Sequence, residues 1–156
     1  MSAEDHMRRA IALSLEMMRS GRGGPFGAVV TRGDKIIAEG FNKVTTSNDP
    51  TAHAEIVAVR NACQALNTFV LTGCEIFTSC EPCPMCLSAI YWARLDRIWF
   101  ANDRHDAAKI GFRDEFLYRE ISLPPAERSI PIQPLLRAEG WAAFEEWDRK
   151  PDKVQY

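Results

Sequence analysis

Two short segments of the chain carry residue types that bind metal ions. One is His53-Ala54-Glu55, and the other is Pro82-Cys83-Pro84-Met85-Cys86. Cys83 and Cys86 are three residues apart, so on a helix both thiolates lie on one face. Zinc prefers thiolate and imidazole donors, and a site with three protein ligands leaves a fourth position for water. The spacing therefore predicts a zinc site made by His53, Cys83 and Cys86.

The carboxylate of Glu55 lies two residues after the predicted ligand His53. Two helical positions correspond to about 200° of rotation, so the two side chains are not expected to bind the same ion. Glu55 can instead reach a water molecule beside the metal, and zinc can lower the pKa of that water to about 7. A carboxylate in this place can take the proton of the water and pass it to a leaving nitrogen. The pattern thus predicts hydrolysis at an amidine-like ring carbon.

The same residues also admit a structural zinc site or a non-enzymatic zinc-binding module. Structural sites usually close with a fourth protein ligand. The remaining candidates are His6, His105, Cys63, Cys74 and Cys80, and none of them has matching spacing. We interpret Cys63, Cys74 and Cys80 as packing residues. A catalytic zinc is therefore the favoured interpretation.

Hydrophobic periodicity and turn residues predict the elements that position these side chains. Helices are expected at about 2–21, 50–67, 84–92 and 135–149, and shorter ones around Asp106 and at 115–120. Strands are expected at 26–31, 35–41, 75–79 and 97–101, the first two as a hairpin. Four of the nine prolines fall within 124–134, which makes that segment extended and stiff. This order predicts a three-layer α/β/α domain with a mixed sheet.

Composition and charge favour a single globular domain and argue against a protein that binds nucleic acid. The 156 residues are 46% hydrophobic and 26% charged, which fits one globular domain and argues against a disordered chain. Nineteen basic residues oppose 21 acidic ones, so there is no basic surplus, and tRNA or DNA is a weaker default partner. No signal peptide or membrane-spanning run is recognisable. Three of the five cysteines crowd together, which favours a metal site in a cytoplasmic protein over a disulfide framework.

The two metal-binding segments together match the H-x-E and P-C-x-x-C signature of zinc deaminases, and the chain resembles the cytidine-deaminase-like superfamily. Over essentially its whole length it is similar to bacterial guanine deaminases. The matching stretches are GGPFGA at 23–28, Asn42, TTSNDPTAHAE at 45–55, SCEPCPMC at 79–86, AIYWAR at 89–94, GFRD at 111–114, and Tyr156. Arg113 departs from the pattern, because the resemblance leads us to expect an acidic residue beside Asp114.

The resemblance and the pattern of elements together set our expectation for the fold. We expect the three-layer α/β/α cytidine-deaminase-like fold, with a central five-stranded mixed sheet flanked by helices. Residues 1–156 are expected to form a single zinc-dependent deaminase domain. Within it, residues from about 121 to 156 are expected to form a C-terminal arm and helix.

The resemblance also implies roles for five further residues, and four of them have a structural explanation as well. Phe26 is expected to stack on a purine, although it could be a strand core residue. Asn42 is expected to read a ring edge, or it could be a turn residue, and the Ala54 N–H is expected to bind a ring nitrogen or carbonyl. Asp114 is expected to accept hydrogen bonds from N1–H and the 2-amino group of guanine and to assist catalysis, or it could cap a helix. Trp92 is expected to line the pocket or to pack on a helix face.

Tyr156 is the last residue of the sequence, where the general expectation is disorder. The resemblance implies instead that the C-terminal segment crosses to a second subunit and covers its active site. This makes a domain-swapped homodimer the expected assembly, with Tyr156 closing the neighbouring pocket.

The expected reaction is hydrolysis of guanine to xanthine and ammonia, with one zinc ion per subunit. Zinc-bound hydroxide is expected to attack C2, with Glu55 as the proton shuttle and Asp114 as a second catalytic residue. The small purine is the expected partner, with no nucleic acid and no membrane. Alternatives are a tRNA adenosine deaminase, or a deaminase of another amino-purine or an aminotriazine such as ammeline.

Overall fold

The computed structural model describes residues 1–156, which form two compact units, Met1–Tyr118 and Arg119–Tyr156. The first unit contains a mixed sheet with the strand order β2-β1-β3-β4. Its strands are β1 (Gly27–Arg32), β2 (Lys35–Phe41), β3 (Glu75–Cys80) and β4 (Arg97–Asn102). β1 pairs antiparallel with both β2 and β3, whereas β3 and β4 are parallel. The predicted mixed sheet is therefore confirmed.

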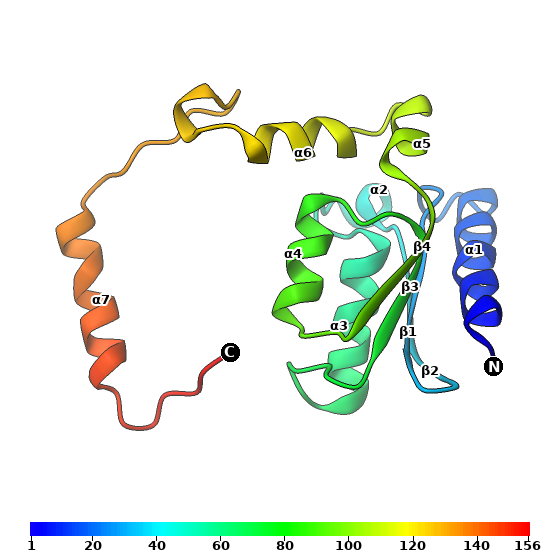
Figure 1. Cartoon of the computed structure of the whole chain (residues 1–156), viewed down its shortest axis with the longest axis horizontal. Coiled ribbons are helices and arrows are strands. Elements are labelled where there is room, and N and C mark those ends of the chain that lie inside the picture. The colour runs from blue at the N-terminus through cyan, green and yellow to red at the C-terminus, as the bar shows by residue number, and fades with distance from the viewer. The chain divides into compact units, whose positions relative to one another are not determined.

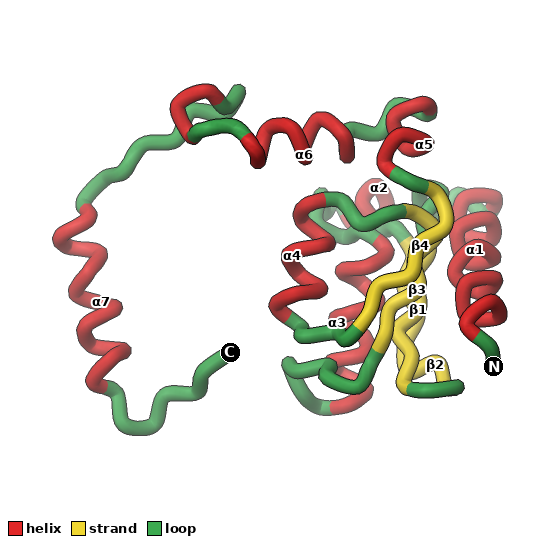
Figure 2. Tube along the Cα trace, viewed as in Figure 1, coloured by secondary structure: helices red, strands yellow, loops and turns green.

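Helices cover both faces of this sheet (Figures 1 and 2). α1 (Ala3–Arg19) lies on one face, and α3 (Ala54–Leu66) and α4 (Pro84–Trp92) lie side by side on the other. α1 begins where the sequence predicts it, because Ser2 and Asp5 cap it reciprocally. Helices on the two faces confirm the predicted α/β arrangement.

The prediction of five strands is wrong, because the sheet has four and ends at β4. Directly after β4, Asp103 accepts from two backbone N–H groups and starts α5 (Arg104–Lys109). α6 (Asp114–Ser122) follows. The next segment contains Pro124, Pro125, Pro131 and Pro134. Proline has no backbone N–H to donate to a neighbouring β-strand. The chain beyond β4 is thus helical or proline-rich, and neither pairs with an edge strand.

The helix predicted to enter at Pro50 begins later, at Ala54, with His53 as its N-cap. Asp49 accepts from both the N–H and the hydroxyl of Thr51, so it forms a turn and does not cap a helix. A short helix that the periodicity did not predict, α2 (Val44–Ser47), precedes this turn. The consequence is that His53 sits at the very start of α3.

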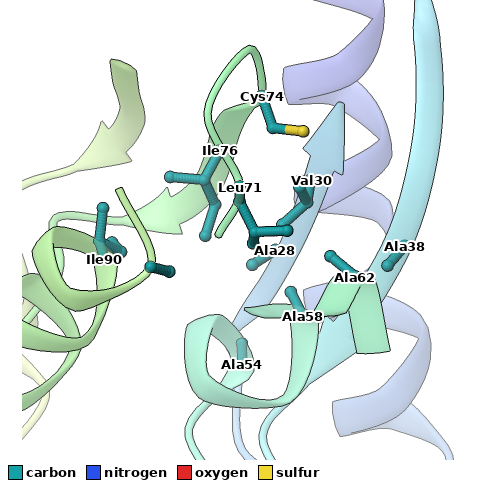
Figure 3. Close-up of a cluster of buried hydrophobic side chains, with 11 residues drawn as sticks. Ala28, Val30, Ala38, Ala54, Ala58, Ala62, Leu71, Cys74, Ile76 and Ile90 are labelled. Carbon is teal, nitrogen blue, oxygen red and sulfur yellow. The ribbon is translucent and has the colours of Figure 1, made fainter. Parts of the chain in front are cut away.

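Small residues bring α3 close to the sheet. Ala54, Ala58 and Ala62 of α3 face Ala28 and other buried side chains of β1 and β2 (Figure 3). Alanine side chains allow a short distance between helix and strand backbones, so a larger residue in this layer would push α3 outward. The packing of α3 therefore determines where its N-terminal residues lie.

α3 and β2 come very close to each other at Gly40 of β2. A Cβ atom at Gly40 would lie 2.3 Å from the carbonyl oxygen of Ala54 and 2.4 Å from the backbone nitrogen of Ala58. We expect Gly40→Ala to lower the free energy of unfolding by about 3 kcal/mol, since backbone atoms would have to move. Denaturant unfolding monitored by circular dichroism measures this. Gly140→Ala is the control, because a Cβ there meets nothing within 4 Å, and equal unfolding midpoints for the two variants would contradict the prediction.

The second unit contains the 3₁₀ helix η1 (Pro125–Glu127) and α7 (Arg137–Arg149). Gly140 does not break α7, and the predicted final helix is present. No residue of this unit is buried, and its large apolar side chains are exposed. None of the helices combines the length and apolar character needed to span a membrane.

Candidate functional site

The three predicted metal ligands come together at the N-termini of two helices. His53 is the N-cap of α3, Cys83 is the N-cap of α4, and Cys86 lies in the first turn of α4. His53 Nδ1 lies 3.6 Å from Cys83 Sγ and 3.5 Å from Cys86 Sγ. The ligand atoms all lie within 4.8 Å of one another. The structure thus brings His53 to two cysteines that lie 30 and 33 residues further along the chain.

This donor set fits a zinc ion. Zinc binds thiolate at about 2.3 Å and imidazole at about 2.0–2.1 Å, and tetrahedral angles then separate sulfur and nitrogen by about 3.6 Å. The two observed separations, 3.5 and 3.6 Å, agree with that geometry. Three protein donors leave the fourth tetrahedral position for a water molecule or substrate.

The electrostatics of the cluster also favour a bound cation. A hydrogen bond from Cys86 lowers the pKa of the Cys83 thiol to about 4, although burial opposes this. The pKa of Cys86 is raised, because it is the partner in that hydrogen bond and is buried. The hydrogen bond with Cys83 raises the pKa of His53. A cysteine thiolate therefore forms at the positive end of the α4 dipole, where it is ready to bind metal.

Glu55 lies in the first turn of α3, and only 6% of its surface is exposed. Burial raises the pKa of its carboxyl group to about 7. It contacts the ligand cluster, because its carboxylate accepts a hydrogen bond from the side chain of Cys86. The predicted proton shuttle is thus next to the ligands but is not one of them.

A cavity of about 480 Å³ opens onto this group and contains the candidate substrate residues Phe26, Asn42 and Asp114. The ring of Phe26 packs edge-to-face on Phe112, with centroids 4.7 Å apart. Asn42 is buried, and its side-chain oxygen accepts from the N–H of Val44 at 3.2 Å. That bond also explains the predicted turn role of Asn42, and it leaves the amide nitrogen as a donor.

Asp114 is the first residue of α6 and lines the same cavity. Burial raises the pKa of its carboxyl group, and the negative charge of Cys83 adds to the effect. The neighbouring Arg113 also lines the cavity, and its guanidinium group lies 4.3 Å from the ring centroid of Phe116. The cavity wall therefore carries one acidic and one basic residue side by side.

Two predicted substrate residues of the first unit, Ala54 and Trp92, do not line the cavity with their side chains. The side chain of Ala54 is fully buried in the core, although its N–H, in the first turn of α3, lacks an intrahelical acceptor. Trp92, at the end of α4, is 68% exposed and is not among the cavity residues. Tyr156 belongs to the second unit.

Other cavity residues were not predicted as functional. Cys80, interpreted as a packing residue, lines the cavity, and burial raises the pKa of its thiol to about 12, so it stays protonated. Glu81 and Leu117 are further examples. The sequence did contain a signal for Cys80, because side chains of a strand point alternately to the two faces of the sheet. Ile76 and Cys80 are four residues apart in β3, so they lie on the same face, and Ile76 packs against residues of α3 on that face.

Comparisons with known proteins agree with this geometry. The chain is 49% identical over 156 residues to the guanine deaminase of Bacillus subtilis, and the match covers all of both chains. The X-ray structure of guanine deaminase from Bacillus subtilis superposes with a TM-score of 0.96, covering 100% of this chain and 99% of that one.

More distant relatives share the fold or part of the sequence. The structure of guanine deaminase from Nitrosomonas europaea is 30% identical, with a TM-score of 0.70, and covers 93% of this chain and 84% of that one. A tRNA-specific adenosine deaminase from Aquifex aeolicus is 42% identical over 77 residues, or 49% of this chain and 51% of that protein. Residues 1–102 match the family model of the cytidine and deoxycytidylate deaminase zinc-binding region. The chain therefore belongs to the cytidine and deoxycytidylate deaminase family of zinc-binding proteins.

Proposed function

We propose that this protein is a hydrolytic deaminase that converts guanine and water to xanthine and ammonia. The observation that carries the proposal is one cavity lined by His53 and Cys83 of the ligand cluster, by the buried Glu55 and by the acidic Asp114. The full-length similarity to a guanine deaminase supports the same substrate.

In the proposed site, each subunit holds one zinc ion through His53, Cys83 and Cys86. When bound, the ion supplies Lewis-acid activation of a water molecule. Glu55 would accept one proton of the attacking water and donate it to N3 of the ring. It would then accept the second proton, from the hydroxyl group now bonded to C2, and pass it to the departing amine. The C2–N bond to the 2-amino group breaks as ammonia leaves, and the oxygen of the water stays on C2. This use of Glu55 requires a carboxylate in the cavity beside the ligands, and the position of Glu55 in the cavity lining supports it.

Recognition of the purine is assigned to the walls of the cavity. Phe26 stacks on the ring, and the amide of Asn42 and the N–H of Ala54 bind polar atoms of the ring edge. Asp114 accepts from N1–H and the 2-amino group and assists the second proton transfer. Adenine has no N–H at N1, so this carboxylate would favour guanine over adenine.

The role of Asp114 can be tested with two substrates. We expect Asp114→Asn to lower kcat/KM for guanine by about tenfold to hundredfold, which is the effect of losing a charge-assisted hydrogen bond. The loss for 2-aminopurine should be smaller, because that base has no N–H at N1. Steady-state ammonia release with both bases measures the difference. An equal loss for both bases would mean that Asp114 does not read N1–H.

We assign the second unit, Arg119–Tyr156, to a homodimer in which this C-terminal segment is exchanged. Three exposed aromatic side chains of α7, Trp141, Phe144 and Trp147, support the assignment, because exposed apolar clusters mark interaction surfaces. The unpaired edge of β4, which carries the half-exposed Phe100, offers a further surface for association. In this assembly Tyr156 covers the cavity of the neighbouring subunit.

Removal of residues 154–156 tests this covering role. We expect the truncated protein to bind zinc as the full chain does but to turn over guanine about tenfold more slowly, since a lid excludes water and completes the site. Zinc content and kcat are measured on the same preparation. Unchanged turnover on guanine would contradict the covering role of Tyr156.

An ammonia-release screen over free bases, nucleosides, ammeline and tRNA tests the proposed reaction. We expect guanine to be the best substrate and tRNA to be inert, with a Glu55→Ala variant inactive on all of them. Preference for ammeline or another amino-heterocycle would move the proposal to that substrate. Salt-sensitive activity on tRNA would replace it with tRNA adenosine deamination.

A further inference from the structure

The two residues before the ligand Cys83 are held by side chains from α5 and α6. Glu81 and Pro82 connect β3 to the first ligand of α4. Arg104, the first residue of α5, binds the carboxylate of Glu81, and Tyr118 of α6 donates its hydroxyl to the carbonyl oxygen of Pro82 at 2.6 Å. None of these four residues is a metal ligand or has a proposed part in the reaction.

The contacts between Arg104 and Glu81 form a fork. The Arg104 Nη2 atom lies 2.7 Å from Glu81 Oε1, and Nε lies 3.2 Å from both carboxylate oxygens. The backbone N–H of Arg104 donates to Oε2 at 2.8 Å. Such charge-assisted forks fix orientation more strictly than a single hydrogen bond does. The carboxylate of Glu81 is thereby tied to the start of α5.

The same guanidinium group also fixes Tyr118. The central carbon of the Arg104 guanidinium lies 3.5 Å from the ring centroid of Tyr118, which is a close cation–π contact. Arg104 thus lies between Glu81 and the Tyr118 ring, and the Tyr118 hydroxyl reaches Pro82. These contacts form one continuous network around the Glu81-Pro82 segment.

The hydrogen bond to Pro82 has a direct consequence for the ligand. The Pro82 carbonyl belongs to the same planar peptide unit as the Cys83 nitrogen, so fixing that oxygen fixes the rotation of the peptide before Cys83. Cys83 itself makes no side-chain cap hydrogen bond to α4. The backbone that Tyr118 holds therefore sets the position of the Cys83 Cβ atom, from which Sγ reaches His53 and Cys86.

Tyr118 also connects this peptide to the helix that carries Asp114. Asp114 and Tyr118 are four residues apart in α6, so they lie on the same face of the helix. The hydrogen bond from Tyr118 to Pro82 therefore ties the helix of the cavity residue Asp114 to the residue before Cys83.

We propose that Tyr118 is a positioning residue that orients Cys83 toward the zinc ion and holds Asp114 beside it, with Arg104 keeping the Tyr118 ring in place. This inference rests on the proposed zinc site. Its prediction concerns metal affinity and ligand geometry, which are measured separately from deamination.

Tyr118→Phe is the test, because it removes one hydroxyl and leaves the ring on which Arg104 stacks. Loss of a group that orients a ligand typically weakens metal binding by 10–100-fold. We expect the zinc dissociation constant, measured by chelator competition, to rise about tenfold, and the visible absorption bands of the cobalt-substituted protein to shift. The unfolding temperature of the metal-free protein should fall by only a few degrees, because one hydrogen bond is lost. Tyr91→Phe is the control, since the Tyr91 ring is 75% exposed and outside the cavity.

A second variant keeps the test valid if Tyr118→Phe folds poorly. Arg104→Gln removes the charged fork but keeps the hydroxyl of Tyr118. It should also raise the zinc dissociation constant. Because both residues act on one peptide, the double variant should lose less affinity than the two single losses combined.

The outcomes separate this inference from the proposed reaction. Zinc affinity and cobalt spectra of Tyr118→Phe and Arg104→Gln that stay within twofold of wild type would overturn the positioning role, even with guanine as a good substrate. Weakened zinc binding in these variants, together with a wild-type protein inert toward guanine, would support the positioning role and overturn only the reaction.

Discussion

Replacement of Glu55 by glutamine is expected to lower kcat for guanine by about 10²–10⁴-fold, the usual contribution of a general acid–base group. Glutamine has nearly the same shape, but its amide cannot accept and return the proton of the attacking water. The carboxylate is almost fully buried and lies in the cavity beside the ligands, so water cannot easily replace it. Zinc content measured by atomic absorption should remain at the wild-type value.

The control for this variant is Glu4→Gln, which changes an exposed glutamate in the first turn of α1. It should have wild-type kcat and zinc content. A Glu55→Gln enzyme that keeps more than a tenth of wild-type turnover would show that another group moves the proton.

Replacement of Cys86 by serine is expected to abolish zinc binding and to reduce activity to background. Serine is nearly isosteric, but its hydroxyl is not ionised and is a poor zinc ligand. Zinc at a thousandfold excess over its dissociation constant stabilises the folded state by about 4 kcal/mol. Cys86→Ser should lose that amount, so its unfolding midpoint in zinc buffer should match that of wild type in chelator. Denaturant titration with and without chelator measures both.

Cys63→Ser tests whether the loss is specific to the ligand. Cys63 is only partly buried, lies on α3 and is not among the cavity residues. This variant should keep its zinc and its activity. A Cys86→Ser protein that still holds one tightly bound zinc ion would contradict the proposed ligand set.

The pairing of the two cysteine ligands was predictable from the sequence because the information for it is local. The spacing of Cys83 and Cys86 fixes their shared helix face, and the structure brings both to His53. The strands were also predictable, since a hairpin with a Gly-Asp turn and two apolar runs has few alternatives. These patterns act over a few residues, and periodicity is informative at that distance.

The features that sequence reasoning missed depend on competition between local interactions. Asp49 before Pro50 is typical of a helix entry, but its carboxylate binds Thr51, and the helix starts four residues later. The fifth strand was expected from the resemblance, yet Asp103 begins a helix at the end of β4. In both cases a single side chain that accepts backbone hydrogen bonds overrides the wider pattern.

The walls of the cavity could not be predicted from residue patterns alone. Phe112 and Asp114 line the same cavity as His53 and follow Gly111, whose φ of 91° favours glycine. The resemblance suggested Asp114 as a site residue, but nothing local to the sequence places it beside His53. Such contacts between distant segments require the coordinates.

The division of the chain at Tyr118 has a consequence for the order of events during synthesis. The ligands, Glu55 and every cavity residue precede Arg119, so the whole metal-binding unit has been made before the second unit leaves the ribosome. N-terminal units generally fold first on the ribosome. In the proposed assembly, a nascent chain could therefore form its cavity and bind zinc while it is still alone, and exchange of the C-terminal segment between subunits would be a later, concentration-dependent step.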